Sequence, residues 1–179
     1  MATPEILHAP HTGVRRANAT EAAQACDVVR QSIPHCCTLD HHDDPHVLAA
    51  WLANKTADRF AAWMTAPGAM AWGAYRGGDG GGCMVRFALH MQSKLALCYV
   101  VPQALHQGAG RALLLAAQDA ARQAGVAAAE LESTRTAEPF YLRQGYEHRR
   151  CGAGLGCTRS PCASACEWGP AAHTHCTIF

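Results

Sequence analysis

The sequence has no uninterrupted apolar run of the ~18 residues that a membrane-spanning helix needs. Its N-terminal segment also lacks the apolar stretch of a secretory signal. Charges nearly balance, with 15 Lys and Arg against 14 Asp and Glu, so no excess of one sign attracts the chain to nucleic acid or to a membrane surface. We therefore expect a cytoplasmic protein with neither nucleic acid nor membrane among its partners.

Two common phosphate-binding motifs are missing as well. No Gly-Lys-Ser or Gly-Lys-Thr is present, which excludes a P-loop, and Leu113 stands where a Rossmann G-x-G-x-x-G needs its third glycine. Cysteine, in contrast, is abundant, with ten residues but no C-x-x-C pair of the kind that zinc sites use. Without a signal peptide we expect reduced thiols rather than a disulfide framework, and no metal site.

The chain is organised around one stretch in its middle. Leu95 to Val101 is an apolar run that predicts a buried strand, and Pro102 ends it because proline cannot donate to a ladder. A loop with Gly108 and Gly110 follows, and residues 111–121 are almost all helix formers. A strand, a glycine turn and a helix N-terminus form an anion site when the unpaired N–H groups of the first turn point at the ligand. A glycine-rich connection without a ligand remains the alternative.

Hydrophobic periodicity predicts a mixed α/β (α+β) chain around this stretch. A strand at 126–131 should lie parallel to the strand before the loop, because a helix over 111–123, ended by Gly125, supplies the crossover. The other expected elements are an edge strand at 13–17, helices at 20–32 (ended by Pro34), 47–54 and 57–65 (capped by Thr56), and a hairpin of strands 69–75 and 83–90.

Val100 and Pro102, followed by Gln107, Gly110 and Ala112 at the start of a leucine-rich helix, form a recognisable motif. It resembles the pyrophosphate loop of bacterial-type members of the GNAT superfamily of acyl-CoA N-acyltransferases. The spacer between Pro102 and Gln107 is about two residues longer than in the family. A register on Gly108 and Gly110 restores the spacer but places Leu105 where the family has Arg or Gln, and we prefer the first register because a loop tolerates insertion.

A second motif lies 133–146, where Ala137, Phe140, Tyr141, Gly145 and Tyr146 match the family's short helix and its Gly-Tyr end. Two motifs in the right order strengthen the resemblance. It implies the family's fold, a mixed and mostly antiparallel central sheet with helices on both faces and a splayed parallel strand pair.

The resemblance also implies an enzyme that moves an acetyl group from acetyl-CoA, its co-substrate, to a primary amine by direct attack in a ternary complex. The acceptor would be a small-molecule or peptide amine, and a homodimer stays open. Tyr141 would protonate the leaving thiolate. A catalytically weak CoA-binding sensor or a metal-responsive protein on the same fold is the alternative function. The residues expected to bind acetyl-CoA are Tyr99, Val100, Val101, Gln107, Gly108, Ala109, Gly110, Arg111, Ala112 and Ala137.

The segment 35–46 is dense in titratable side chains and permits three interpretations. Its aspartates could cap the next helix in a solvated loop, its histidines and carboxylates could bind a metal, or the loop could face the amine substrate. For the third, we expect Asp40 to attract the amine and His41 or His42 to take its proton.

The sequence divides into three parts. Residues 1–12 read as a mobile arm, 13–150 as the acetyltransferase-like domain, and 151–179 as a cysteine-rich closure of the same domain. The family places one or two strands in the last part, and we expect such a strand-and-loop closure there rather than a metal site.

Overall fold

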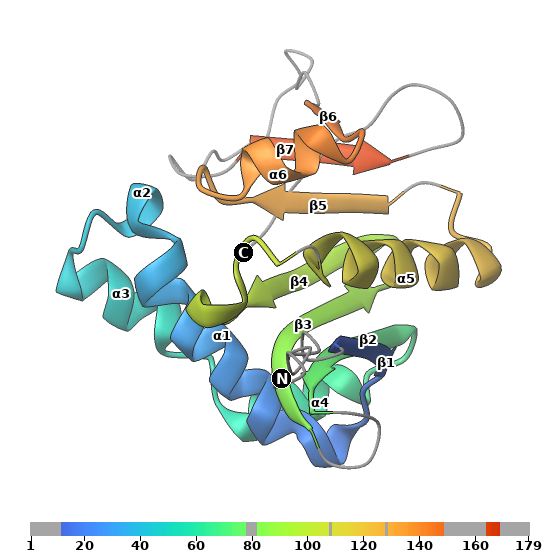
Figure 1. The fold of residues 1–179 in the computed structure, drawn as a ribbon, viewed down its shortest axis with the longest axis horizontal. Coiled ribbons are helices and arrows are strands. Elements are labelled where there is room, and N and C mark those ends of the chain that lie inside the picture. Colours follow the sequence, from blue (N-terminus) through green and yellow to red (C-terminus); the bar gives the residue numbers. More distant parts are fainter. Residues whose placement is uncertain (1–11, 78–81, 108, 128, 149–163, 169–179) are drawn as a thin grey trace, which may run out of the picture.

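A mostly antiparallel sheet forms the centre of the molecule (Figure 1). The computed structural model describes residues 12–77, 82–107, 109–127, 129–148 and 164–168. Within these, seven strands lie in the order β1-β2-β3-β4-β5-β7-β6, and β4 with β5 is the parallel pair. The strands are β1 (Thr12–Arg16), β2 (Ala69–Arg76), β3 (Cys83–Met91), β4 (Lys94–Val100), β5 (Ala129–Ser133), β6 (Glu147–His148) and β7 (Ser164–Trp168).

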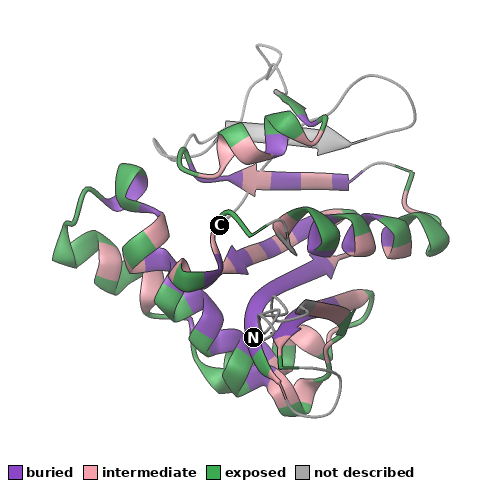
Figure 2. Ribbon diagram, in the orientation of Figure 1, coloured by how far each residue is buried: buried purple, intermediate pink, exposed green. Residues whose placement is uncertain are grey.

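Helices cover both faces of this sheet. Phe60 of α4 packs against Phe87 of β3, with ring centroids 5.7 Å apart, whereas the preceding residue, Arg86, lies against Gly110 of α5. Successive side chains of a strand point to opposite faces, so α4 and α5 lie on opposite sides of β3, which is buried along nearly its whole length (Figure 2). The α-helices are α1 (Ala22–Cys36), α2 (Thr38–His41), α3 (Pro45–Leu52), α4 (Ala57–Met64), α5 (Ala109–Gln123) and α6 (Glu138–Arg143).

Local signals set the helix ends. The Asp44 carboxylate accepts from the His46 N–H at 2.8 Å and starts α3, and the Thr56 hydroxyl accepts from the Arg59 N–H at 3.3 Å and starts α4. Gly125 ends α5 with a φ of 82°, which glycine adopts without strain. The capping expected of Thr56 and the helix stop expected of Gly125 are therefore confirmed.

Two boundaries differ from the sequence prediction. Pro34 was expected to end the first helix, but α1 continues to Cys36 because proline removes only one helical N–H, and the Cys37 N–H again donates to the Ile33 carbonyl at 3.3 Å. β5 begins at Ala129 rather than at Val126. The Val126 N–H is instead used in the stop of α5, where it donates to the Ala121 carbonyl at 2.9 Å.

The C-terminal part contributes β7, which lies between β5 and β6. The remaining residues of that part, and residues 1–11 of the expected N-terminal arm, lie outside the described residues. No described helix combines the length and the apolar character needed to cross a membrane.

Candidate active site

The parallel strands β4 and β5 pair only where both begin. Lys94 lies opposite Glu130, and the Glu130 N–H donates to the Ser93 carbonyl at 2.8 Å. Beyond this point no further pair joins the two strands, so the rest of the β4 edge facing β5 has no strand partner in the described sheet. β4 also carries an extra residue, Ala96, between the pairs Leu97–Leu89 and Leu95–His90. Such a bulge bends a strand, and the expected splayed pair is confirmed.

The backbone groups on this open edge belong to alternate residues. The Val101 N–H donates to the Val85 carbonyl at 3.0 Å, so Val101 and, two residues earlier, Tyr99 direct their backbone groups to β3. Cys98 and Val100 then direct theirs toward the β5 side. The Cys36 thiol at the end of α1 lies 3.8 Å from the Val100 carbonyl, which agrees with this direction. Of the expected residues Tyr99, Val100 and Val101, only Val100 presents its peptide groups to the open edge.

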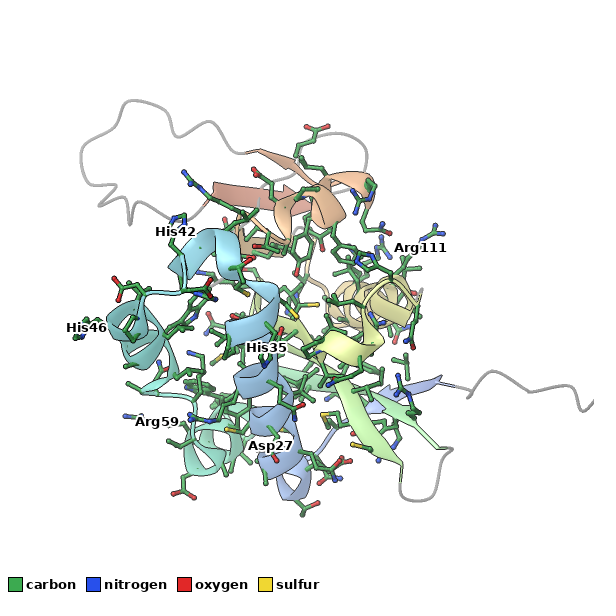
Figure 3. All side chains as sticks on the ribbon, turned by 60° about the vertical axis from the view of Figure 1, so that its left-hand side comes forward. Asp27, His35, His42, His46, Arg59 and Arg111 are labelled. Carbon is green, nitrogen blue, oxygen red and sulfur yellow. The ribbon has the colours of Figure 1, made fainter. Side chains whose placement is uncertain are left out.

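α5 begins at the far end of β4. The first N–H groups of a helix have no partner within the helix, and those of α5 start at Ala109. The side chain of Gln107 is fixed beside them, because its amide nitrogen donates to the Gln103 carbonyl at 2.7 Å and its oxygen accepts from Arg76 at 3.2 Å. Gly108 lies outside the described residues. Ala112 is exposed, and so is Arg111, which points away from α5 in Figure 3.

Two arginines that the sequence analysis missed lie under this turn. Arg86 is only 5% exposed, donates to the Ala104 carbonyl, and lies so close to α5 that a Cβ added at Gly110 would be 2.8 Å from its Nη1. Arg76 lies on β2, the strand next to β3, and its side chain donates a hydrogen bond to the side chain of Gln107. The Nε atoms of both arginines are buried without a hydrogen-bond partner in the described structure. The sequence contains one signal for Arg86, which is its position inside the apolar run of β3. An arginine is almost never fully buried unless its charge is paired.

Tyr141 of α6 lies against Cys98 of the same strand, β4. It is 1% exposed, its ring lies edge-on to Phe140 and Tyr146 at 5.1 and 5.5 Å, and its hydroxyl hydrogen-bonds the thiol of Cys98. Burial, and then the neighbouring Cys98, raise the pKa of Tyr141 well above its ordinary value. The phenol is therefore protonated near neutral pH, as a general acid must be.

Asp40 is a buried clamp between distant segments. Its carboxylate accepts from the Arg135 N–H at 2.7 Å, from the Thr136 hydroxyl at 3.0 Å and from the Thr136 N–H at 3.4 Å. These residues form the connection from β5 to α6, where the Ala137 N–H in turn donates to the Thr134 hydroxyl at 3.1 Å. Asp40 thus holds α2 to the segment that positions α6, and Ala137 lies in that segment.

His41 and His42 are adjacent but differ in their surroundings. His41 is 1% exposed, and its Nε2 lies 3.2 Å from the Ile33 carbonyl while its Nδ1 accepts from the Asp43 N–H at 3.0 Å. This pattern fits the neutral tautomer with its proton on Nε2, which leaves neither nitrogen open to a substrate. His42 ends α2 in a left-handed conformation and is exposed, on the outer side of the α2–α3 segment with His46 (Figure 3).

No group of three or more His, Cys, Asp and Glu side chains suited to a metal ion occurs among the described residues. Of the cysteine-rich segment 151–179, the structure describes only β7, Ser164–Trp168, which contains Cys166.

Comparisons with known proteins bear on the fold and the family of the chain. The family model for the acetyltransferase (GNAT) domain matches residues 38–152. Among solved structures, a GCN5-related N-acetyltransferase from Rhodopseudomonas palustris superposes with a TM-score of 0.72 at 18% identity, covering 94% of this chain and 100% of that one. The PaiA N-acetyltransferase from Thermoplasma acidophilum, in complex with coenzyme A, gives 0.72 at 14% identity over 89% and 99% of the two chains.

The alanine N-acetyltransferase of ribosomal protein S18 from Escherichia coli gives a TM-score of 0.60 at 18% identity, over 94% and 96% of the two chains. A sequence comparison with curated proteins finds no match. At these sequence identities the similarity to solved structures shows the fold alone. The family model covers more than half of the chain and therefore shows the family. The chain belongs to the family of acetyltransferase (GNAT) domains.

Proposed function

We propose that this protein transfers an acetyl group from acetyl-CoA to a primary amine. The observation that carries the proposal is the order of three features along β4. The N-terminus of α5 lies at the end of the strand, an open backbone edge lies along it, and the Tyr141 phenol lies at Cys98 in its middle. An acyl-CoA has a diphosphate, two amides and a thioester in that same order.

Acetyl-CoA would bind along this line. Its diphosphate would accept from the backbone N–H groups at the start of α5, from Ala109 to Ala112, with Gln107 beside them. The pantetheine amides would pair with the open edge of β4 as a short added strand, through the peptide groups of Cys98 and Val100. Arg86 has no anion beside it in the described structure, and the diphosphate would supply one. The open edge of β4 has no strand partner, and the pantetheine amides would take that place.

The chemistry then follows as direct acyl transfer. A neutral amine attacks the thioester carbonyl, and a backbone N–H on the open edge of β4 stabilises the oxyanion. As the tetrahedral intermediate collapses, the C–S bond breaks, and Tyr141 donates its proton to the departing CoA thiolate. The amine nitrogen loses one proton to a base or to water, and solvent returns a proton to Tyr141.

Asp40, His41, His42 and Glu132 are the candidate bases for the amine proton, and they differ in their surroundings. Asp40 and His41 are buried in hydrogen bonds, and the Glu132 carboxylate forms an ion pair with Lys94 at 2.5 Å. His42 is exposed, so its imidazole is open to solvent and to a substrate. We therefore retain His42, or a water chain, as the proton acceptor.

A panel of amines tests the proposal, with thiol release from acetyl-CoA as the readout. The panel should combine small primary amines with peptides that have a free N-terminus or a lysine. At least one amine should give thiol release and an acetylated product in equal amounts. Tight acetyl-CoA binding without turnover on any amine would favour the CoA-binding sensor, and no binding at all would contradict both functions.

A further inference from the structure

Arg76 and Arg86, together called the cationic floor, carry positive charge that nothing in the described structure neutralises. Neither arginine takes part in an ion pair among the described residues. Arg86 of β3 pairs with Ala74 of β2, two residues before Arg76, and Arg86 is 5% exposed. Burial lowers the pKa of Arg86. The nearby Cys98 raises this pKa, and the positive charge of Arg76 lowers it. Such an arrangement is unfavourable unless an anion binds nearby.

The cationic floor lies directly beneath the loop that leads into α5. Arg86 donates to the Ala104 carbonyl, and its Nη1 fills the space on the sheet side of Gly110. Arg76 donates to Gln107, the last described residue before α5. The N-terminus of α5 adds its own partial positive charge at the same place, so three sources of positive potential converge there.

We propose that the cationic floor is part of the acyl-CoA site, with Arg86 and Arg76 as positioning residues that hold the loop from below and provide the charge that balances the CoA diphosphate. This inference rests on the proposed function, and it extends the site from the loop to two strands beneath it. Each arginine holds the loop through one donor and keeps its Nε without a partner. A side chain needed only to hold the loop would not need a full positive charge in a buried place.

Two substitutions of Arg86 separate the effect of its charge from the effect of its hydrogen bonds. Arg86→Lys keeps the charge and loses the planar fork, whereas Arg86→Gln keeps an N–H donor for the loop and loses the charge. Arg59→Gln is the matched control, because Arg59 is exposed on α4, which covers the opposite face of the sheet. The probes are acetyl-CoA, S-acetylpantetheine, which has no diphosphate, and inorganic pyrophosphate.

We expect Arg86→Gln to weaken acetyl-CoA binding roughly 10- to 100-fold in calorimetry, because charge-assisted hydrogen bonds are the strong ones. Arg86→Lys should lose less, Arg59→Gln nothing, and inorganic pyrophosphate should compete with acetyl-CoA for the wild type but much less for Arg86→Gln. Turnover of S-acetylpantetheine should stay within about twofold of wild type in every variant, because it has no diphosphate.

The proposal is overturned if a folded Arg86→Gln binds acetyl-CoA as wild type does, or if it loses acetyl-CoA and S-acetylpantetheine equally. If the Arg86 variants do not fold, Arg76→Gln is the test, because Arg76 lies nearer the surface than Arg86. An Arg76→Gln variant that binds acetyl-CoA with the affinity of the wild type also overturns the proposal. In either case, turnover of acetyl-CoA by the wild-type protein still supports the proposed function. If the wild-type protein does not bind acetyl-CoA, both the proposed function and this inference are wrong.

Discussion

Replacing Asp40 by alanine should destabilise the fold strongly, although the sequence alone marks this residue as a substrate contact. The carboxylate is 5% exposed and accepts from the Arg135 N–H, the Thr136 N–H and the Thr136 hydroxyl. Hydrogen bonds to a charged group are worth about 1.5–3 kcal/mol each, and a donor left unpaired in the interior costs a similar amount. Arg135 and Thr136 are themselves exposed, so water can reach part of the gap.

We therefore expect Asp40→Ala to lower the free energy of unfolding by about 2–4 kcal/mol. For a chain of this size that corresponds to roughly 5–15 °C in Tm. Asp40→Asn, which keeps one carbonyl oxygen as acceptor, should lose about half as much.

Thermal and urea unfolding, followed by circular dichroism, give the measurement. Asp43→Asn is the matched control, since the Asp43 side chain is 81% exposed and asparagine tolerates its positive φ of 57°. It should change stability by less than about 0.5 kcal/mol. Equal and small effects of Asp40→Asn and Asp43→Asn would refute the clamp. A stable Asp40→Ala variant with a raised KM for the amine alone would instead restore the substrate role.

Three further changes test separate parts of the structure. Tyr141→Phe should lower kcat about 10²–10⁴-fold while acetyl-CoA affinity in calorimetry stays near wild type, because only the acidic hydroxyl is removed; wild-type turnover would show that water protonates the thiolate. Burial lowers the pKa of His90 from its ordinary 6.5, so the unfolded chain binds a proton more readily and stability should fall as the pH drops through about 6.5. His90→Leu should flatten that acid slope in urea unfolding between pH 5 and 7.5, and an unchanged slope would assign it to other groups. Gly73→Ala should cost about 1–3 kcal/mol in thermal unfolding, because the new Cβ would lie 2.6 Å from the Tyr75 hydroxyl and break its 2.7 Å bond to Glu21; a variant as stable as wild type would mean that the ring moves freely.

Much of the fold follows from local patterns. The apolar run before Pro102 and the helix formers after Gly110 each determine one element, and both lie where the sequence predicts them. The order of the hairpin, the crossover helix and the short helix with Tyr141 is confirmed as well. These features depend on residues close in sequence, so periodicity and turn residues suffice to predict them.

The site depends instead on contacts between distant residues. Asp40 bonds to residues about 95 positions later, and no local pattern distinguishes a carboxylate with such partners from a solvated one. His41 is buried and His42 exposed because α2 turns only one of them inward. The position of Arg86 beneath the loop depends on how β3 pairs with its neighbours, which the sequence does not specify.

Titration of acetyl-CoA into wild type and Gly110→Asp tests the central claim most directly. The new carboxylate would stand at the start of α5, against Arg86, where the account places the diphosphate. Leu115→Asp adds the same charge to an exposed position of α5 away from its N-terminus and serves as the control. We predict one acetyl-CoA bound per wild-type chain, unchanged binding by Leu115→Asp, and at least a tenfold loss in a folded Gly110→Asp. Equal affinity of all three proteins, or no binding by the wild type, would contradict the account.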